Sequence, residues 1–162
     1  WEPAIRFELG DPNEHDNSKY IAGSYERAIT LYNTLHRQDD ECIIVMDVFE
    51  LDLKRKNLTP FLNKSQHFRI AMTTYERDEI LFYRFEIACK AEEIAMSKLL
   101  RTNIPHRVYI LNKHTQTIFH VYDDRGCDVL GSDVESLRPL YEQYKDWILD
   151  YDREAITRMF EE

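Results

Sequence analysis

Glycine is scarce in this chain, which holds four glycines among 162 residues. Phosphate-binding loops need glycine, because the backbone must turn tightly and approach the phosphate closely. The sequence has no Walker loop, no GxGxxG pattern of a dinucleotide-binding fold and no GxSxG pattern of a serine hydrolase. The motifs therefore give no support to these enzyme classes.

Cysteine is also rare, and the three cysteines, Cys42, Cys89 and Cys127, form no CxxC pair. An odd number spread over apolar segments argues against a disulfide framework and fits a reducing cytoplasm. We therefore expect a cytoplasmic protein with all three thiols in its core. None of the six histidines lies in an HExxH motif or at ligand spacing from a cysteine, so we expect no zinc site and no cofactor.

Long hydrophobic runs are missing as well. No segment approaches the roughly 18 apolar residues that a membrane-spanning helix requires, so we expect no membrane anchor. Hydrophobic residues still make up 43% of the chain, which predicts one core and a single α+β domain over residues 1–162. Because the chain opens on Trp1 rather than Met, we expect the numbering to start partway into a longer natural protein.

Basic residues are outnumbered, with 21 Lys and Arg against 30 Asp and Glu and a formal net charge of -9. A phosphate backbone is held by clustered Lys and Arg, so this balance disfavours nucleic acid as a partner. The excess is also uneven. Residues 121–162 hold 12 acids and 5 bases, a net of -7, so the last quarter of the chain carries most of the negative charge.

The apolar pattern of the first 50 residues predicts two strands around one helix. Residues 4–9 alternate as in a strand with one buried face, and residues 21–37 repeat apolar side chains at three and four, as in an amphipathic helix. Residues 42–49 form a dense β-branched run, which predicts a central strand.

The middle of the chain is more ambiguous. Pro60 predicts one helical turn within a basic segment. Residues 68–74 and 80–89 predict two further strands, although periodicity alone leaves a helix open for the second. Residues 91–100 are strong helix formers and predict a helix with Ile94 and Leu100 on its inner side.

Residues 106–130 predict a β-meander. Residues 106–111 and 117–122 are β-branched and aromatic, and the short polar connector NKHTQ between them predicts a hairpin. Residues 127–130 predict a third, antiparallel strand. Between the last two strands lies a tight turn, in which Gly126 is expected to supply a positive φ that other residues tolerate poorly.

The C-terminal region predicts helices. Residues 132–135, SDVE, have the spacing of a capping box. Pro139 then predicts either a short first turn with a second helix from near Arg138 or one kinked helix. Asp150 or Asp152 is expected to cap a last helix. Together these elements predict an α+β fold with a mainly antiparallel sheet, packed by the N-terminal amphipathic helix and the C-terminal helices.

Three aspartates, Asp123, Asp124 and Asp128, surround Arg125. In one interpretation they build a turn: Asp123 or Asp124 accepts hydrogen bonds from turn amides, and Arg125 pairs with a neighbouring acid. The spacing differs from that of a calcium loop, which needs alternating acidic ligands and a distal Glu. The sequence therefore favours the turn.

The alternative is a metal-dependent hydrolase. The same three carboxylates then hold a divalent cation, with Glu8 or His120 as a fourth ligand. However, His120 lies in the middle of a predicted strand, where a partly buried side chain with satisfied hydrogen bonds is expected. A nuclease-like triplet, Asp52-Leu53-Lys54, also occurs, but a solvated strand end explains it more simply.

A second group of acidic and aromatic residues lies near the C-terminus. It comprises Trp147, Asp150, Tyr151, Asp152 and Arg153. Aromatic side chains anchor a partner while acids steer it, so one interpretation is a recognition patch for a basic protein. In the other, both aromatic residues pack in the core and the acids complement the helix dipole. The core is favoured for Trp147, and the acids are left open between the two interpretations.

Four long motifs resemble a known bacterial family. IRFELG at 5–10, HRVYIL at 106–111, IFHVYDDRGCDVL at 118–130 and DWILDYDRE at 146–154 are together similar to the family catalogued as domain of unknown function 3885. The resemblance spans nearly the whole chain and includes the YDDRG signature, residues 122–126. It implies a small cytoplasmic protein of Bacillus-type bacteria with no assigned activity, and it assigns no catalytic residue.

These observations favour a non-enzymatic protein-binding module whose acidic C-terminal face meets a basic protein partner. An antitoxin or immunity protein is one concrete form, because masking a basic toxin calls for a rigid acidic surface. The partner and the oligomeric state stay open. The candidate binding residues are Tyr122, Asp123, Asp124, Arg125, Asp128, Asp150, Asp152 and Arg153.

Overall fold

The structure is a computed structural model that describes residues 3–49, 69–77, 80–101 and 108–161. Within these residues seven strands form one antiparallel sheet in the order β1-β7-β6-β5-β2-β4-β3. The strands are β1 Ala4–Glu8, β2 Glu41–Phe49, β3 Arg69–Arg77, β4 Ile80–Lys90, β5 Val108–Asn112, β6 Thr117–Asp123 and β7 Gly126–Gly131. The second segment left open between strand and helix is therefore a strand, β4.

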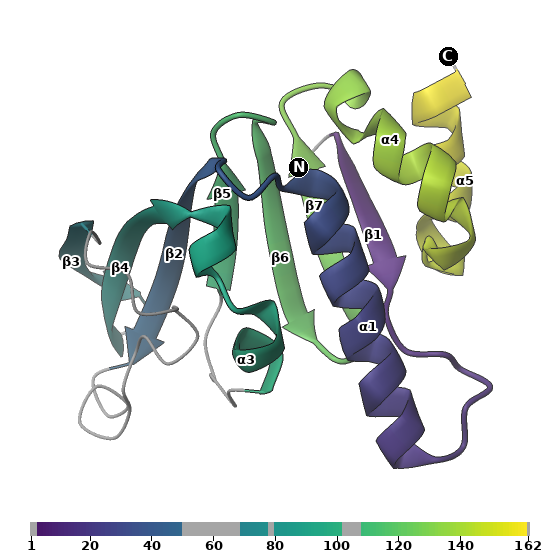
Figure 1. Cartoon of the computed structure of the whole chain (residues 1–162), viewed down its shortest axis with the longest axis horizontal. Coiled ribbons are helices and arrows are strands. Elements are labelled where there is room, and N and C mark those ends of the chain that lie inside the picture. Colours follow the sequence, from purple (N-terminus) through teal and green to yellow (C-terminus); the bar gives the residue numbers. More distant parts are fainter. Residues whose placement is uncertain (1–2, 50–68, 78–79, 102–107, 162) are drawn as a thin grey trace.

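Four α-helices accompany the sheet in the described part of the chain. They are α1 Asn17–Leu35, α3 Met96–Arg101, α4 Val134–Tyr144 and α5 Asp150–Glu161, with short 3-10 turns η1 Ala91–Glu93 and η2 Lys145–Trp147. Figure 1 shows α1 and α3 over one face of the sheet and α5 beside β1. The predicted α+β class, the antiparallel sheet with its C-terminal meander and the C-terminal helices are confirmed.

The sheet has one strongly apolar face because its strands alternate. In β1, Ile5 and Phe7 are fully buried while Arg6 between them is exposed. The β-branched strand β2 lies between β5 and β4, and its Ile44 is also fully buried. Cys42 and Cys127 lie in this core and Cys89 packs partly buried against it.

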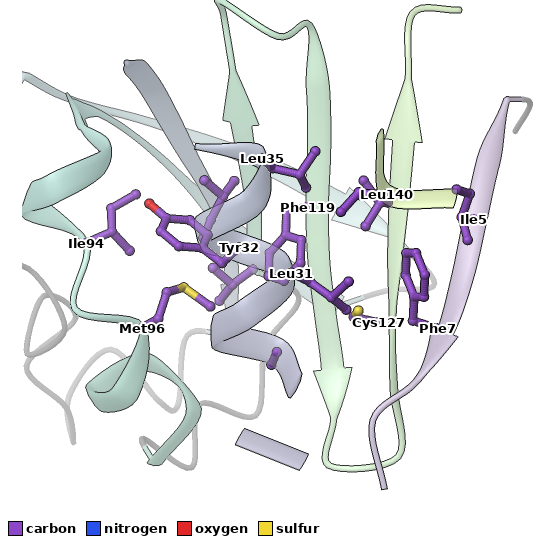
Figure 2. Packing of buried hydrophobic residues seen from close by; sticks show 14 of the residues in the cluster. Ile5, Phe7, Leu31, Tyr32, Leu35, Ile94, Met96, Phe119, Cys127 and Leu140 are labelled. Carbon is purple, nitrogen blue, oxygen red and sulfur yellow. The ribbon is translucent and has the colours of Figure 1, made fainter. Parts of the chain in front are cut away.

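Helix α1 supplies the other side of the core. Asp16 caps its first turn by accepting hydrogen bonds from the amides of Ser18 and Lys19. Leu31 and Tyr32 face the sheet and are buried. Figure 2 shows Tyr32 among the buried side chains, near Phe119 of β6. The apolar repeat therefore brings the C-terminal half of α1 into the core.

The helix predicted over residues 91–100 is broken, and the prediction of one continuous helix was wrong. The carbonyl of Ala91 accepts hydrogen bonds from the Tyr32 hydroxyl and from the Ile94 amide. The amides of Ala91 and Glu92 donate to the carbonyls of Asp40 and Gln38. Because these bonds tie η1 to the loop between α1 and β2, the α-helix starts only at Met96.

The C-terminal helices also differ from the sequence expectation. The N-cap of α4 is Asp133, one residue after the predicted capping box begins, because its carboxylate accepts the Ser136 amide at 2.8 Å. Pro139 lies inside α4, so a second helix starting near Arg138 was wrong. Asp150 and Asp152 lie in the first turn of α5 rather than at its cap. The helical turn predicted at Pro60 lies outside the described residues.

The free edge of β1 is covered by the segment that precedes α5. Ile148 forms an antiparallel bridge with Phe7, and the Leu149 amide donates to the Arg6 carbonyl at 3.1 Å. This short pairing holds α5 beside β1.

None of the described helices is long and apolar enough to cross a membrane.

His36 is a buried titratable group at the end of α1. Its side chain is 8% exposed and stacks on the Tyr32 ring at 4.1 Å between centroids. Nδ1 lies 2.8 Å from the Tyr32 carbonyl and therefore donates to it, whereas Nε2 has no hydrogen-bond partner in the described structure. Burial lowers the pKa of His36 below its usual 6.5.

We predict that acidification destabilises the protein through His36. Below about pH 6.5 the imidazole binds a proton in the unfolded state but not in the folded state. The free energy of unfolding therefore decreases as the pH decreases, by at most about 1.4 kcal/mol per pH unit. Urea unfolding from pH 7.5 to 5.5 should show a shallower slope for His36→Phe than for the natural chain. His15→Asn, at an exposed histidine, is the control. Equal slopes for His36→Phe and the natural chain would contradict the assignment.

Candidate functional site

The YDDRG signature forms the turn between β6 and β7. Asp123 pairs with Gly126 across the hairpin, and Asp124 and Arg125 make the turn itself. The Asp123 carboxylate accepts the Arg125 amide at 2.8 Å and also the Arg125 guanidinium, with Nε at 2.8 Å. The bond from the guanidinium is the main reason that the pKa of Asp123 is lowered. These contacts have the geometry that the turn interpretation predicts.

Gly126 is needed for a different reason from the one predicted. None of the four glycines has a positive φ, and Gln116, in the β5–β6 turn, is the residue that does in the described structure. A Cβ at Gly126 would lie 2.9 Å from the Phe7 carbonyl oxygen and closer still to the Tyr122 phenol. The expectation of a left-handed glycine was wrong, because close packing of β1 against the turn is what excludes a side chain here.

Asp128 lies in β7, beyond the turn, and forms an ion pair with Arg6 of β1. The guanidinium Nε of Arg6 donates to the Asp128 carboxylate at 2.9 Å, and its NH1 lies 3.3 Å from the Asp152 carboxylate. Arg6 therefore links two candidate residues that are distant in sequence, one on β7 and one on α5. No sequence pattern singles out Arg6, because only the pairing of β1 with β7 places it opposite Asp128.

Tyr122 lies beside the Arg6–Asp128 ion pair, and 43% of its surface is exposed to solvent. Burial, followed by the nearby Asp128 carboxylate, raises the pKa of Tyr122 to about 12, so its phenol is neutral at physiological pH. Its ring is tilted towards His120, which stacks on Tyr109 at 4.3 Å between centroids. His120 Nδ1 is 2.9 Å from the Val108 carbonyl, so this histidine is partly buried and hydrogen-bonded.

The residues at the start of α5 divide into a structural and an exposed group. Arg153 donates to the carbonyls of Lys145 and Ile148, both at 2.7 Å, and to the Asp150 carboxylate at 2.9 Å. It thereby fastens η2 to α5. Asp150 itself projects into solvent, with 93% of its side chain exposed.

The two aromatic residues of this group have opposite environments. Trp147 is partly buried, stacks on Tyr144 at 4.8 Å and lies beneath the Arg27 guanidinium at 5.2 Å. Tyr151, by contrast, is 90% exposed, so the interpretation that packs both aromatic residues in the core does not hold for it. The buried stripe of α5 contains Ile156 and Phe160, and a residue five positions before Ile156 points well away from that stripe.

The three aspartates of the hydrolase alternative do not form a common site. Asp123 is held by Arg125 and Asp128 by Arg6, on different sides of the hairpin. Among the described residues, no group of three or more His, Cys, Asp or Glu side chains is placed to hold a metal ion. The Asp52-Leu53-Lys54 triplet lies outside the described residues.

The comparison with known proteins identifies the family. The model of the family described as "Domain of unknown function (DUF3885)" matches residues 1–152. The chain belongs to this family. A relative in Bacillus subtilis (strain 168), described as "Uncharacterized protein YnaE", is 28% identical over an alignment that covers 93% of this chain and 88% of that protein. No solved structure matches significantly. The resemblance found in the four motifs is thus confirmed, and it brings no assigned activity.

We predict opposite effects of two glycine substitutions. Gly126→Ala should destabilise the protein by about 1–3 kcal/mol, because the added methyl group meets the Phe7 carbonyl and forces β1 from the turn. Gly23→Ala is the matched control, since nothing lies within 4 Å of its Cβ and the residue is inside α1. It should stabilise by roughly 0.5–1 kcal/mol. Equal unfolding free energies for Gly126→Ala and the natural chain would contradict the close-packing account.

Proposed function

We propose that this DUF3885 protein is a non-enzymatic protein-binding module that holds a basic partner on its acidic C-terminal face. We define this face as the exposed side of α4, η2 and α5. The observation that carries the proposal is Tyr151, which is 90% exposed between Asp150 and Asp152. A tyrosine anchors an interface at low entropic cost, and flanking carboxylates steer a cationic partner towards it.

The charge of this face supports a basic partner. Helix α4 contacts both η2 and α5, so their acids belong to one surface region. Exposed acids on it include Glu142, Asp146 and Glu161. Other acids pair locally with arginine, as in Glu135 with Arg138.

These local pairs do not cancel the attraction. Glu135, Asp150 and Glu154 keep 71%, 93% and 81% of their side chains exposed while they pair with Arg138, Arg153 and Arg158 on their own helices. Exposed pairs of this kind contribute about 0–1 kcal/mol. Lysine or arginine from a partner therefore competes for these carboxylates at little cost.

An immunity protein or antitoxin is the concrete form that this proposal takes. Such a protein masks a basic toxin, and fast association needs a preformed surface of opposite charge. The face rests on α4 and α5, which are fixed to the sheet through contacts with β1 and β7. It is therefore built on ordered elements, which suits rigid recognition.

We predict that reversing charge on the acidic C-terminal face abolishes capture of a basic partner from a lysate of the source bacterium. The triple variant Glu142→Lys, Asp146→Lys, Glu154→Lys should lose a partner that the natural chain holds at 50 mM salt and releases at 500 mM. The matched control changes net charge equally at exposed acids elsewhere. It consists of Glu26→Lys, Asp39→Lys and Glu86→Lys. Equal loss with both triples, or a captured partner that is acidic, would refute the proposal.

We also predict that Tyr151→Ala weakens binding of that purified partner by at least about tenfold, as expected for an interface anchor. Its melting temperature should stay within about 1 °C of the natural chain, because a side chain that is 90% exposed adds little to folding. Calorimetric titration and thermal melting test the two statements. Unchanged affinity would remove Tyr151 from the interface.

A further inference from the structure

A cavity of about 220 Å³ lies between the helices and the sheet, away from the acidic C-terminal face. Strands β5 and β6 form its floor, and α1 and α3 supply its walls through residues such as Ile21, Tyr25 and Leu100. Most of the lining is aliphatic or aromatic. None of the lining residues belongs to α4, η2 or α5, so this cavity is independent of the proposed protein-binding surface.

The cavity exists because packing between the two layers is uneven. In the C-terminal half of α1, Leu31 and Leu35 are buried against the sheet. In the N-terminal half, Ile21 and Tyr25 face the same layer but stay partly exposed. Helix α3 is only six residues long, and its Leu100 is also partly exposed. Apolar side chains thus line a space that the described residues leave unfilled.

One end of the cavity is negatively charged. Asp123 and Asp124 of the β6–β7 turn line it together with Tyr122. Asp123 is neutralised by Arg125, but the partly buried Asp124 side chain makes no hydrogen bond or ion pair in the described part of the chain. A partly buried carboxylate without such a bond favours a cation beside it. Tyr25 of α1 lines the same cavity, and an aromatic residue there suits a cation as well.

We propose that this cavity binds a small organic ammonium compound, with its apolar body over β5 and β6 and its charged nitrogen at Asp124. The volume limits the body to one ring or a short alkyl chain, because an apolar cavity of about 150 Å³ accommodates benzene and drug-sized ligands need roughly 300 Å³ or more. The charge at the other end selects a cation: a carboxylate ligand would be repelled by Asp124, whereas an amine would pair with it.

If the cavity is only a packing defect, a different pattern of ligand binding is expected. An apolar void accepts neutral molecules according to size alone, and the carboxylate then contributes nothing. Charge selectivity therefore separates a built site from a void. A neutral molecule of the same shape is the necessary comparison.

The test uses three probes of one shape: 2-phenylethylamine, 2-phenylethanol and phenylacetate. Each is titrated into the natural chain at pH 7, and amide chemical shifts are followed by NMR. We expect saturable shifts with the amine at Ile21, Leu100 and Val121, with a dissociation constant on the order of 1 mM, as befits so small a ligand. The alcohol should bind at least about tenfold more weakly and the acid not at all.

Two variants and a control complete the test. Asp124→Asn should reduce amine affinity to that of the alcohol, whereas Asp146→Asn, at an exposed acid of η2, should leave it unchanged. Ile21→Phe, which fills the cavity from α1, should weaken all binding. The proposal is overturned if the alcohol binds as tightly as the amine, if Asp124→Asn binds the amine normally, or if none of the probes saturates. Because none of these probes involves the acidic C-terminal face, failure here leaves the protein-binding proposal standing.

Discussion

The close approach of β1 to the β6–β7 turn is the constraint on which the rest of this structure depends. The Leu9 amide donates to the Arg125 carbonyl at 2.9 Å, and Gly126 leaves room for the Phe7 carbonyl beside it. This contact sets the register of β1 on β7, with Phe7 opposite Cys127 and Arg6 opposite Asp128. A shift by one residue would turn Phe7 to solvent and Arg6 into the core.

The same contact determines where the C-terminal helices lie. Once β1 is in place, its outer edge pairs with the segment before α5, and Arg6 reaches both Asp128 and Asp152. Helix α5 of the acidic C-terminal face is therefore positioned by a turn some 25 residues earlier in the chain. Within the signature, Asp123 and Gly126 serve the fold, whereas Asp124 is the residue at which we propose that a ligand binds.

The sequence predicted what local patterns determine. Alternation in residues 4–9 and the three-four repeat after residue 20 reflect burial of one face, which each segment encodes by itself. The composition of residues 123–126 likewise predicted a turn. Contacts between distant segments were not predictable in this way. Arg6 matters through a partner 122 residues away, and η1 interrupts a good helical sequence because Tyr32 and the loop before β2 compete for its backbone groups.

Hydrogen exchange at the Arg125 and Leu9 amides tests the central claim most directly. Asp123→Ala removes the acceptor of the Arg125 amide and loosens the carbonyl that Leu9 binds, so both amides should exchange faster, by about tenfold for a loss of roughly 1.4 kcal/mol. Asp124→Ala, its neighbour of equal charge, should leave both rates within about twofold. If Asp124→Ala accelerates exchange as much as Asp123→Ala, or if neither does, the turn is not what holds β1 in place.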